Sequence, residues 1–124
     1  MSGEPRRVLV VDDSADIRGF MRAALEHEGY RVALAENGRQ ALERQREQPA
    51  ELLVTDIFMP DVDGIETIAR FKSEFPSVPV IAMSAGGAAK MQDYLRIAGY
   101  IGADAVLAKP FGVEELVRTV RRVL

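Results

Sequence analysis

The sequence predicts a doubly wound α/β domain, in which one five-stranded parallel sheet is flanked by five helices. Short apolar runs of strand length recur along the chain, and segments with helical spacing lie between them. Because almost every residue of these runs is apolar, we expect the strands to be buried on both faces, as in parallel sheets that helices cover on each side. The alternation therefore predicts right-handed crossovers between parallel strands.

The elements follow in order along the chain. The predicted strands are VLVV (8–11), VALA (32–35), LLVT (52–55), VPVIAM (78–83) and AVLA (105–108). Clear apolar stripes mark the first, fourth and fifth helices, namely Ile17, Phe20, Met21, Ala24 and Leu25, then Met91, Tyr94, Leu95 and Ala98, then Val113, Leu116, Val117 and Val120. The helices predicted at 38–48 and 64–75 have weaker stripes, but Pro49 and Pro76 mark their ends.

Length and composition limit the classes of function. The 124 residues suit one domain spanning 1–124, and 28% charged with 48% hydrophobic residues is typical of a soluble globular protein. The net charge of -3 opposes a direct nucleic-acid partner. The chain has no cysteine, no apolar run typical of a signal peptide and no stretch near the ~20 apolar residues of a membrane span. We therefore expect a cytoplasmic protein without a membrane partner and without disulfide or thiolate chemistry.

Three carboxylates follow two of the predicted strands. Asp12 and Asp13 come directly after the first strand, and Asp56 comes directly after the third. In open α/β sheets, ligands bind beyond the carboxyl ends of the strands, where the strand order reverses. With the order 2-1-3-4-5 these strands would be neighbours, and the three carboxylates would repel one another unless a cation intervened. Mg²⁺ prefers one or two carboxylates with water and phosphate oxygens, so we expect a magnesium site there.

A simpler interpretation exists for the first two carboxylates alone. Asp12 or Asp13 could cap the first helix by accepting backbone N–H bonds at its start. Asp56 favours a site instead, because the segment after it, IFMPDVDG (57–64), looks like a turn and not like a helix start.

Two more polar residues follow predicted strands. Ser84 comes at the end of the fourth strand, directly after VPVIAM, and Lys109 comes at the end of the fifth, directly after AVLA and before Pro110. Alone, such a serine is an ordinary turn residue and such a lysine an ordinary solvated residue. At one sheet edge with three aspartates, they complete a phosphoryl site that offers a nucleophile, a metal, a hydroxyl donor and a cation.

These motifs resemble the receiver domain of the two-component response-regulator family along the whole chain. They are VVDDS (10–14), VTDIFMPDVDGIE (54–66), PVIAMSA (79–85) and LAKPF (107–111). The resemblance implies a flavodoxin-like fold with strand order 2-1-3-4-5. It also implies a signalling phosphoacceptor, not an enzyme, that assists its own phosphorylation and dephosphorylation. Asp56 would accept a phosphoryl group from a phosphohistidine on a histidine kinase or histidine phosphotransfer protein.

The resemblance also assigns the metal ligands. Mg²⁺ would be bound by Asp13 and Asp56 directly, by Asp12 mainly through water, and by the backbone carbonyl of Phe58. The Phe58 side chain would place bulk where water approaches the phosphoryl group and so slow dephosphorylation. A side chain that points away would leave the rate unchanged.

Further expectations concern the ends of the last two strands. By resemblance, Ser84 and Lys109 would bind phosphoryl oxygens, and the bond between Lys109 and Pro110 would be cis. Many relatives carry Tyr or Phe where this chain has Val106. Because valine is too short for an aromatic switch, we expect phosphorylation to act through Ser84 and residues 85–87 on the fourth helix.

The fourth helical segment has more apolar residues than one buried face needs. These residues are Met91, Tyr94, Leu95, Ile97, Tyr100 and Ile101. One interpretation is a longer helix with a broad core stripe. The other is a surface for a downstream protein target or for a homodimer. The sequence leaves both open.

Three alternatives compete with a stand-alone regulator or phosphorelay shuttle. The chain could be a receiver excised from a hybrid histidine kinase or a larger response regulator, or an interaction module of the same shape that is never phosphorylated. The third is an aspartate-nucleophile phosphatase, since DVDGIET (61–67) loosely resembles a DxDGT motif. That motif must follow a buried strand directly, whereas Met59 and Pro60 precede it here.

Overall fold

The computed structural model describes residues 5–57, 64–84, 96, 99 and 102–124. The strands in these ranges are β1 (Arg7–Val11), β2 (Arg31–Ala35), β3 (Leu52–Asp56), β4 (Val80–Ser84) and β5 (Ala105–Ala108). The helices are α1 (Ala15–His27), α2 (Gly38–Glu47), α3 (Gly64–Glu74) and α5 (Val113–Val123). The fourth helix predicted between β4 and β5 falls almost entirely outside the described residues, as does Phe58. Within the described part, none of the helices has the length and apolar character needed to cross a membrane.

The strands form one parallel sheet in the order β2-β1-β3-β4-β5, which confirms the predicted doubly wound arrangement. β1 pairs with β2 on one side and with β3 on the other, so Val11 lies opposite both Ala35 and Thr55. The chain moves outward from β1 to β2 and then returns to the other side of β1 as β3. The strand order therefore reverses at β1, and the carboxyl ends of β1 and β3 border the place where open α/β sheets bind ligands.

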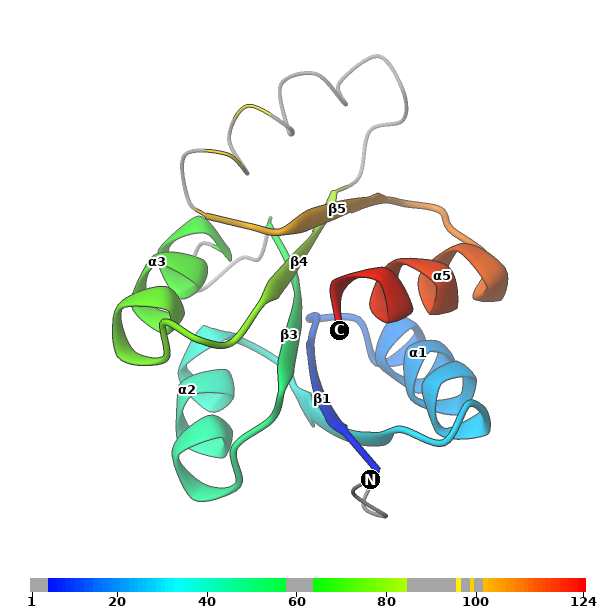
Figure 1. The fold of residues 1–124 in the computed structure, drawn as a ribbon, viewed down its shortest axis with the longest axis horizontal. Coiled ribbons are helices and arrows are strands. Elements are labelled where there is room, and N and C mark those ends of the chain that lie inside the picture. The colour runs from blue at the N-terminus through cyan, green and yellow to red at the C-terminus, as the bar shows by residue number, and fades with distance from the viewer. Residues whose placement is uncertain (1–4, 58–63, 85–95, 97–98, 100–101) are drawn as a thin grey trace.

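Helices cover both faces of the sheet. Figure 1 shows α2 and α3 on one face and α1 and α5 on the other. Each face has its own apolar core, one containing Phe71 of α3 and the other containing Leu116 of α5. Leu53 belongs to the first core and Val54 to the second, as the two-residue period of a strand requires. β3 is buried along its whole length, which gives its last residue, Asp56, a fixed support.

β4 begins later than the sequence predicts and ends later too. The apolar pattern predicts a strand at 78–83, whereas β4 runs from Val80 to Ser84. Pro79 has no backbone N–H for the sheet, and only its carbonyl pairs with β3, accepting the Leu53 N–H at 3.0 Å. At the other end, the strand carries Ser84 to the sheet edge, where the residue is only 1% exposed.

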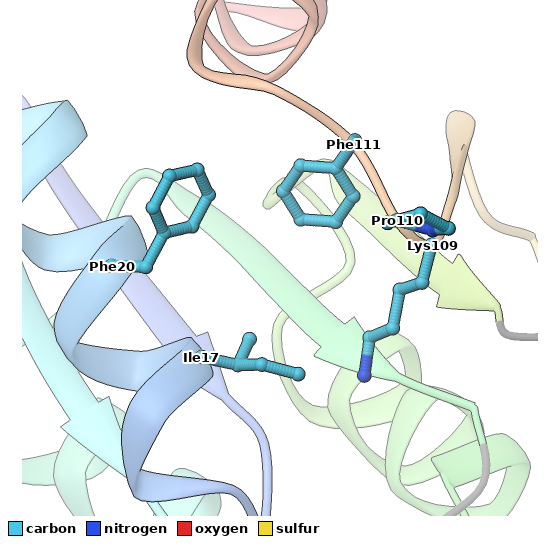
Figure 2. A pocket seen from close by; sticks show the side chains of 5 residues that line it. All are labelled: Ile17, Phe20, Lys109, Pro110 and Phe111. Carbon is cyan, nitrogen blue, oxygen red and sulfur yellow. The ribbon is translucent and has the colours of Figure 1, made fainter.

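An apolar surface joins α1 to the start of α5. Phe20 and Val113 are the exposed large hydrophobic residues of the described part, at 39% and 44%. Figure 2 shows the ring of Phe20 near that of Phe111, with centroids 6.3 Å apart. A pocket of about 370 Å³ here is lined by Ile17, Phe20, Lys109, Pro110 and Phe111. We refer to Ile17, Phe20, Pro110, Phe111 and Val113 as the α1–α5 apolar surface.

Candidate functional site

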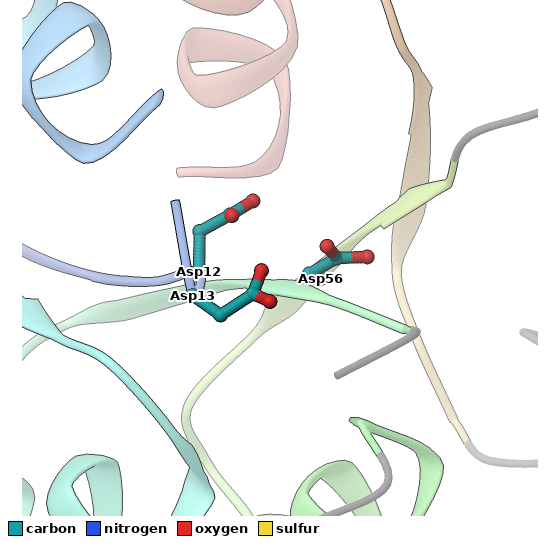
Figure 3. A group of neighbouring side chains, drawn as sticks. All are labelled: Asp12, Asp13 and Asp56. Carbon is teal, nitrogen blue, oxygen red and sulfur yellow. The ribbon is translucent and has the colours of Figure 1, made fainter. Parts of the chain in front are cut away.

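Three carboxylates meet at the carboxyl edge of the sheet. Asp12 and Asp13 follow β1, and Asp56 is the last residue of β3. One carboxylate oxygen of each lies within 4.8 Å of the others. Figure 3 shows the three side chains gathered between the two strand ends. The predicted cluster is therefore present, because β1 and β3 pair directly and end side by side.

Asp12 is engaged by the protein at each of its polar groups. Its N–H donates to the Ala35 carbonyl at 3.2 Å, and its own carbonyl accepts from the Arg18 guanidinium at 2.7 Å. Its carboxylate oxygens accept the Ser14 N–H at 2.9 Å and the Lys109 ammonium at 2.7 Å. The residue is only 1% exposed. These contacts favour a supporting role for Asp12.

Asp13 has the opposite surroundings. Its side chain is exposed, and no hydrogen bond or ion pair of its carboxylate is found within the part of the chain that the structure describes. The cap of α1 is Ser14, whose hydroxyl accepts the Ile17 N–H at 3.3 Å. Capping therefore does not account for Asp13, and a cation could bind it without breaking a described contact.

Lys109 bridges the carboxylates of Asp12 and Asp56. Its Nζ lies 2.7 Å from Oδ2 of Asp12 and 2.9 Å from Oδ2 of Asp56, and its side chain is 16% exposed. Burial by itself lowers the pKa of Lys109, but the hydrogen bonds to Asp12 and Asp56 outweigh burial, so the pKa is raised above its usual 10.5. Lys109 therefore remains a cation at neutral pH and reduces the repulsion within the cluster.

Ser84 lies beside Asp56 on the next strand. Asp56 pairs with Met83 across β3 and β4, and Ser84 is the following residue. The Ser84 carbonyl accepts the Lys109 N–H at 2.6 Å, which joins the ends of β4 and β5. No hydrogen bond of the Ser84 hydroxyl is found among the residues described, so this hydroxyl can donate to a ligand oxygen. The bond between Lys109 and Pro110 is cis, as predicted.

The donor set fits a hard divalent cation such as Mg²⁺. Three carboxylates can each direct an oxygen to one position, and Mg²⁺ accepts one or two carboxylates while water or phosphate oxygens complete its shell. The carbonyl of Phe58, which the resemblance adds to this set, lies outside the described residues. The same edge offers an ammonium and a hydroxyl for an anion. Such a combination is typical of phosphoryl-transfer sites.

Two residues that shape this edge were not predicted. Ser14 caps α1, and the sequence contains a signal for it, because a serine directly before a helical stripe is a common N-cap. Arg18 binds the Asp12 carbonyl, and nothing in the sequence indicates this, because a lone arginine on a helix usually extends into solvent.

Val106 lies in β5 opposite Ala82 of β4. It is partly buried and packs against the core on the α2–α3 face. Residues 85–87 and most of the fourth helical segment, to which we assign the conformational signal, lie outside the described residues. The route of the signal therefore stays a prediction.

Comparisons with known proteins agree on one family. The family model of the response regulator receiver domain matches residues 8–121. The response regulator MprA of Mycolicibacterium vanbaalenii is 36% identical over 121 residues, which are 97% of this chain and 51% of MprA. The transcriptional regulatory protein ZraR of Klebsiella oxytoca is 49% identical over 85 residues, 68% of this chain and 19% of ZraR.

A solved structure extends the similarity to the fold. The chemotaxis protein CheY4 of Vibrio cholerae matches with a TM-score of 0.88 and 30% sequence identity, over 97% of this chain and 99% of CheY4. In contrast, this chain spans about half of MprA and a smaller part of ZraR.

Proposed function

Because this chain belongs to the response regulator receiver domain family, we propose that it is the phosphoacceptor of a two-component or phosphorelay system, with Asp56 as the accepting residue. The observation that carries the proposal is the position of the Asp56 carboxylate, which lies within 4.8 Å of the two carboxylates that follow β1 and 2.9 Å from the Lys109 ammonium. Asp12 is engaged at each of its polar groups, which suits a supporting residue. Asp13 has no ion pair among the described residues, which leaves its carboxylate open to a cation. Asp56 therefore suits the nucleophile best.

The chemistry follows from these positions. A carboxylate oxygen of Asp56 attacks the phosphorus of a phosphohistidine, an O–P bond forms, the N–P bond breaks, and its electron pair remains on the imidazole. The carboxylate is already ionised at neutral pH and needs no general base. Its requirement is lower repulsion towards the incoming anion, which the Lys109 ammonium and the Ser84 hydroxyl supply.

Mg²⁺, held by Asp13 and Asp56 with the Phe58 carbonyl and with Asp12 through water, would supply further charge neutralisation. The product on Asp56 is an acyl phosphate, which water can hydrolyse. The modification is therefore temporary, and the residues that promote its formation also promote its loss.

The α1–α5 apolar surface is the docking place that we propose for the phosphodonor. This surface borders the site, because Lys109 lines the same pocket as Phe20 and Phe111 (Figure 2). A donor protein must bring its phosphohistidine to Asp56, so its contact area must adjoin that edge of the sheet. The exposed ring of Phe20 offers an aromatic anchor of the kind that contributes strongly to protein interfaces. The donor would be a histidine kinase or a histidine phosphotransfer protein in the cytoplasm.

Phosphorylation of Asp56 would act as a signal by changing the contacts of this domain with other proteins. MprA is a response regulator and ZraR a transcriptional regulatory protein, which supports a regulatory role for the protein that contains this domain. A downstream protein or a second copy of the chain would bind near the fourth helical segment. A stand-alone regulator and a receiver within a longer protein are both compatible with this role.

The phosphatase alternative has less support. That class of enzyme requires its motif directly after a buried strand, whereas β3 ends at Asp56 and the motif begins only at position 61. The similarity to the chemotaxis protein CheY4 over nearly the whole of both chains also favours the phosphoacceptor.

Incubation with acetyl phosphate and Mg²⁺, followed by mass mapping of the adduct, tests the assignment. We expect one phosphoryl group on Asp56 in the wild type and none in Asp56→Asn. Asp16→Asn is the matched control, because Asp16 is an exposed aspartate in the first turn of α1, close to the site along the chain. It should be labelled like the wild type. A stable label that survives in Asp56→Asn would refute the assignment.

A further inference from the structure

Arg18 lies beside the carboxylate cluster without a part in the chemistry described above. It projects from α1, yet its side chain is only 15% exposed. Its Nη1 donates to the carbonyl oxygen of Asp12 at 2.7 Å. Its Nη2 lies 3.9 Å from Oε1 of Glu36, the residue that follows β2. One guanidinium thus links α1 to the carboxyl ends of β1 and β2.

The Asp12 carbonyl needs this donor because it lies in the joint between a strand and a helix. The Asp12 N–H still pairs with Ala35 of β2, whereas the first bond into the α1 ladder runs from the Arg18 N–H to the Ser14 carbonyl at 3.1 Å. The Asp12 carbonyl therefore belongs to neither ladder. Backbone carbonyls that are removed from water are nearly always paired, and here the guanidinium provides the pair.

This carbonyl belongs to the peptide plane that joins Asp12 to Asp13. The Asp13 carboxylate has no hydrogen bond within the described ranges, so its direction depends on its backbone. Figure 3 shows it between the two strand ends, close to the Asp56 carboxylate. We propose that Arg18 is a positioning residue that orients Asp13 for Mg²⁺ through the Asp12 carbonyl, and that Glu36 holds Arg18 in place. The inference rests on the proposed function, because it concerns the same metal site.

Arginine suits this position better than lysine. Its planar guanidinium presents donors in a fixed fork and can serve two acceptors, whereas an ammonium is a single point of charge. The positive charge by itself would weaken Mg²⁺ binding by repulsion. Glu36 and the Asp12 carbonyl partly offset that charge, so we expect the positioning effect to be the larger of the two.

Mg²⁺ affinity of the full chain, measured by isothermal titration calorimetry, tests the inference without any phosphorylation. Arg18→Gln removes the fork and the charge, and we expect it to bind Mg²⁺ about tenfold more weakly, as is typical when a partner of a metal ligand is lost. Arg18→Lys keeps the charge and should show a smaller loss. Arg22→Gln is the matched control, because Arg22 lies one turn further along α1 and pairs only with Glu26 among the described residues, at 3.4 Å. It should match the wild type.

Two further measurements separate positioning from a general loss of structure. Glu36 is 63% exposed, so Glu36→Gln should leave the fold intact and weaken Mg²⁺ binding in the same direction as Arg18→Gln, but less. Labelling of Arg18→Gln by acetyl phosphate should return to the wild-type rate at saturating Mg²⁺, because only the affinity for the metal is lowered. A damaged fold would not be rescued by metal.

The opposite results would overturn the inference. Tighter Mg²⁺ binding by Arg18→Gln, together with unchanged binding by Arg18→Lys, would mean that Arg18 acts through its charge alone. Equal affinity in wild type, Arg18→Gln and Arg18→Lys would mean that the Asp12 carbonyl does not orient Asp13. Failure of the wild type itself to bind Mg²⁺ would instead reject the proposed function, and the inference with it, so the two failures are distinguishable.

Discussion

A side chain at Gly64 would collide with the backbone of Asp56. A Cβ built on Gly64 overlaps the carbonyl oxygens of both Asp56 and Ile57. The cause is the close approach of α3 to the end of β3, where the Gly64 N–H donates to the Ile57 carbonyl at 2.9 Å. Gly64 is not among the positive-φ residues, so the position requires glycine for space and not for conformation. The residue that begins α3 thus supports the strand that carries the acceptor carboxylate.

Gly64→Ala should therefore damage both stability and phosphorylation. We expect the free energy of unfolding to fall by about 1 to 3 kcal/mol, as for other overpacked sites, and labelling by acetyl phosphate to slow because the end of β3 is displaced. Gly19→Ala is the control, since a Cβ there meets no atom within 4 Å and the residue lies inside α1. That variant should gain roughly 0.5 to 1 kcal/mol. Urea unfolding measures both, and a Gly64→Ala protein as stable and active as wild type would contradict the close approach.

Asp13→Ala should lose Mg²⁺ binding and, with it, labelling of Asp56. Because the Asp13 side chain is exposed and has no described partner, its removal should leave the melting temperature unchanged or slightly raised, through reduced repulsion in the cluster. Calorimetric titration with Mg²⁺ measures the affinity. Asp16→Ala removes another exposed carboxylate from the same region and should keep full affinity. Unchanged Mg²⁺ binding in Asp13→Ala would remove Asp13 from the metal site.

Lys109 should make stability depend on pH at the alkaline end. Its pKa in the folded protein lies above 10.5, so the stabilisation from its charge is complete below pH 10.5 and is lost as the pH rises through the folded-state pKa. The difference in unfolding free energy between wild type and Lys109→Gln should therefore narrow as the pH rises above about 10.5. Lys109→Arg should keep its charge across that range. A constant difference between wild type and Lys109→Gln would show that the ion pairs with Asp12 and Asp56 do not stabilise the fold.

Phe20→Ala should separate two kinds of phosphodonor. Transfer from a histidine kinase or phosphotransfer protein should slow, since the variant removes the exposed ring of the α1–α5 apolar surface. Labelling by acetyl phosphate needs no docking surface and should proceed at the wild-type rate, which makes it the internal control. Equal rates of protein-dependent transfer in wild type and Phe20→Ala would place the docking surface elsewhere.

Beryllofluoride, a phosphoryl mimic, should change amide NMR shifts mainly at residues 84–101. A charge-assisted bond from the Ser84 hydroxyl to the mimic contributes roughly 1.5 to 3 kcal/mol, enough to move a two-state loop. Val106 packs against the core and is too short to act as an aromatic switch. Shifts concentrated around Val106 and α5, with residues 86, 87 and the fourth helical segment unchanged, would reject this route.

The strands and the cluster could be predicted because local patterns determine them. A run such as LLVT, in a chain where strands and helices alternate, is typical of a parallel sheet that helices cover on both faces. Once β1 and β3 pair, Asp56 must lie near Asp12 and Asp13. The start of β4 was predicted less well. Val78 and Pro79 continue the apolar pattern, but β4 begins at Val80 because proline has no backbone N–H to donate to the sheet.

The different roles within the cluster could not be predicted from the residues alone. Asp12 and Asp13 are identical neighbours in the sequence, yet one is engaged and the other exposed. Contacts from other elements make the difference: Lys109 after β5 binds the Asp12 carboxylate, and Arg18 on α1 binds its carbonyl. The spacing of residue types does not contain that information, because it depends on how distant segments pack.

The ion pair between Lys109 and Asp12 joins positions 97 residues apart, and Lys109 follows the edge strand β5. Pairing of β1 with β3 alone brings the three acidic groups together, whereas the neutralising ammonium arrives only when β5 docks. If β1 and β3 pair before β5 docks, like charges are held close to one another until Lys109 arrives, and contacts of such long sequence separation form slowly. Refolding should then be slowest at low ionic strength and fastest when salt or a divalent cation screens the acidic edge before the last strand docks.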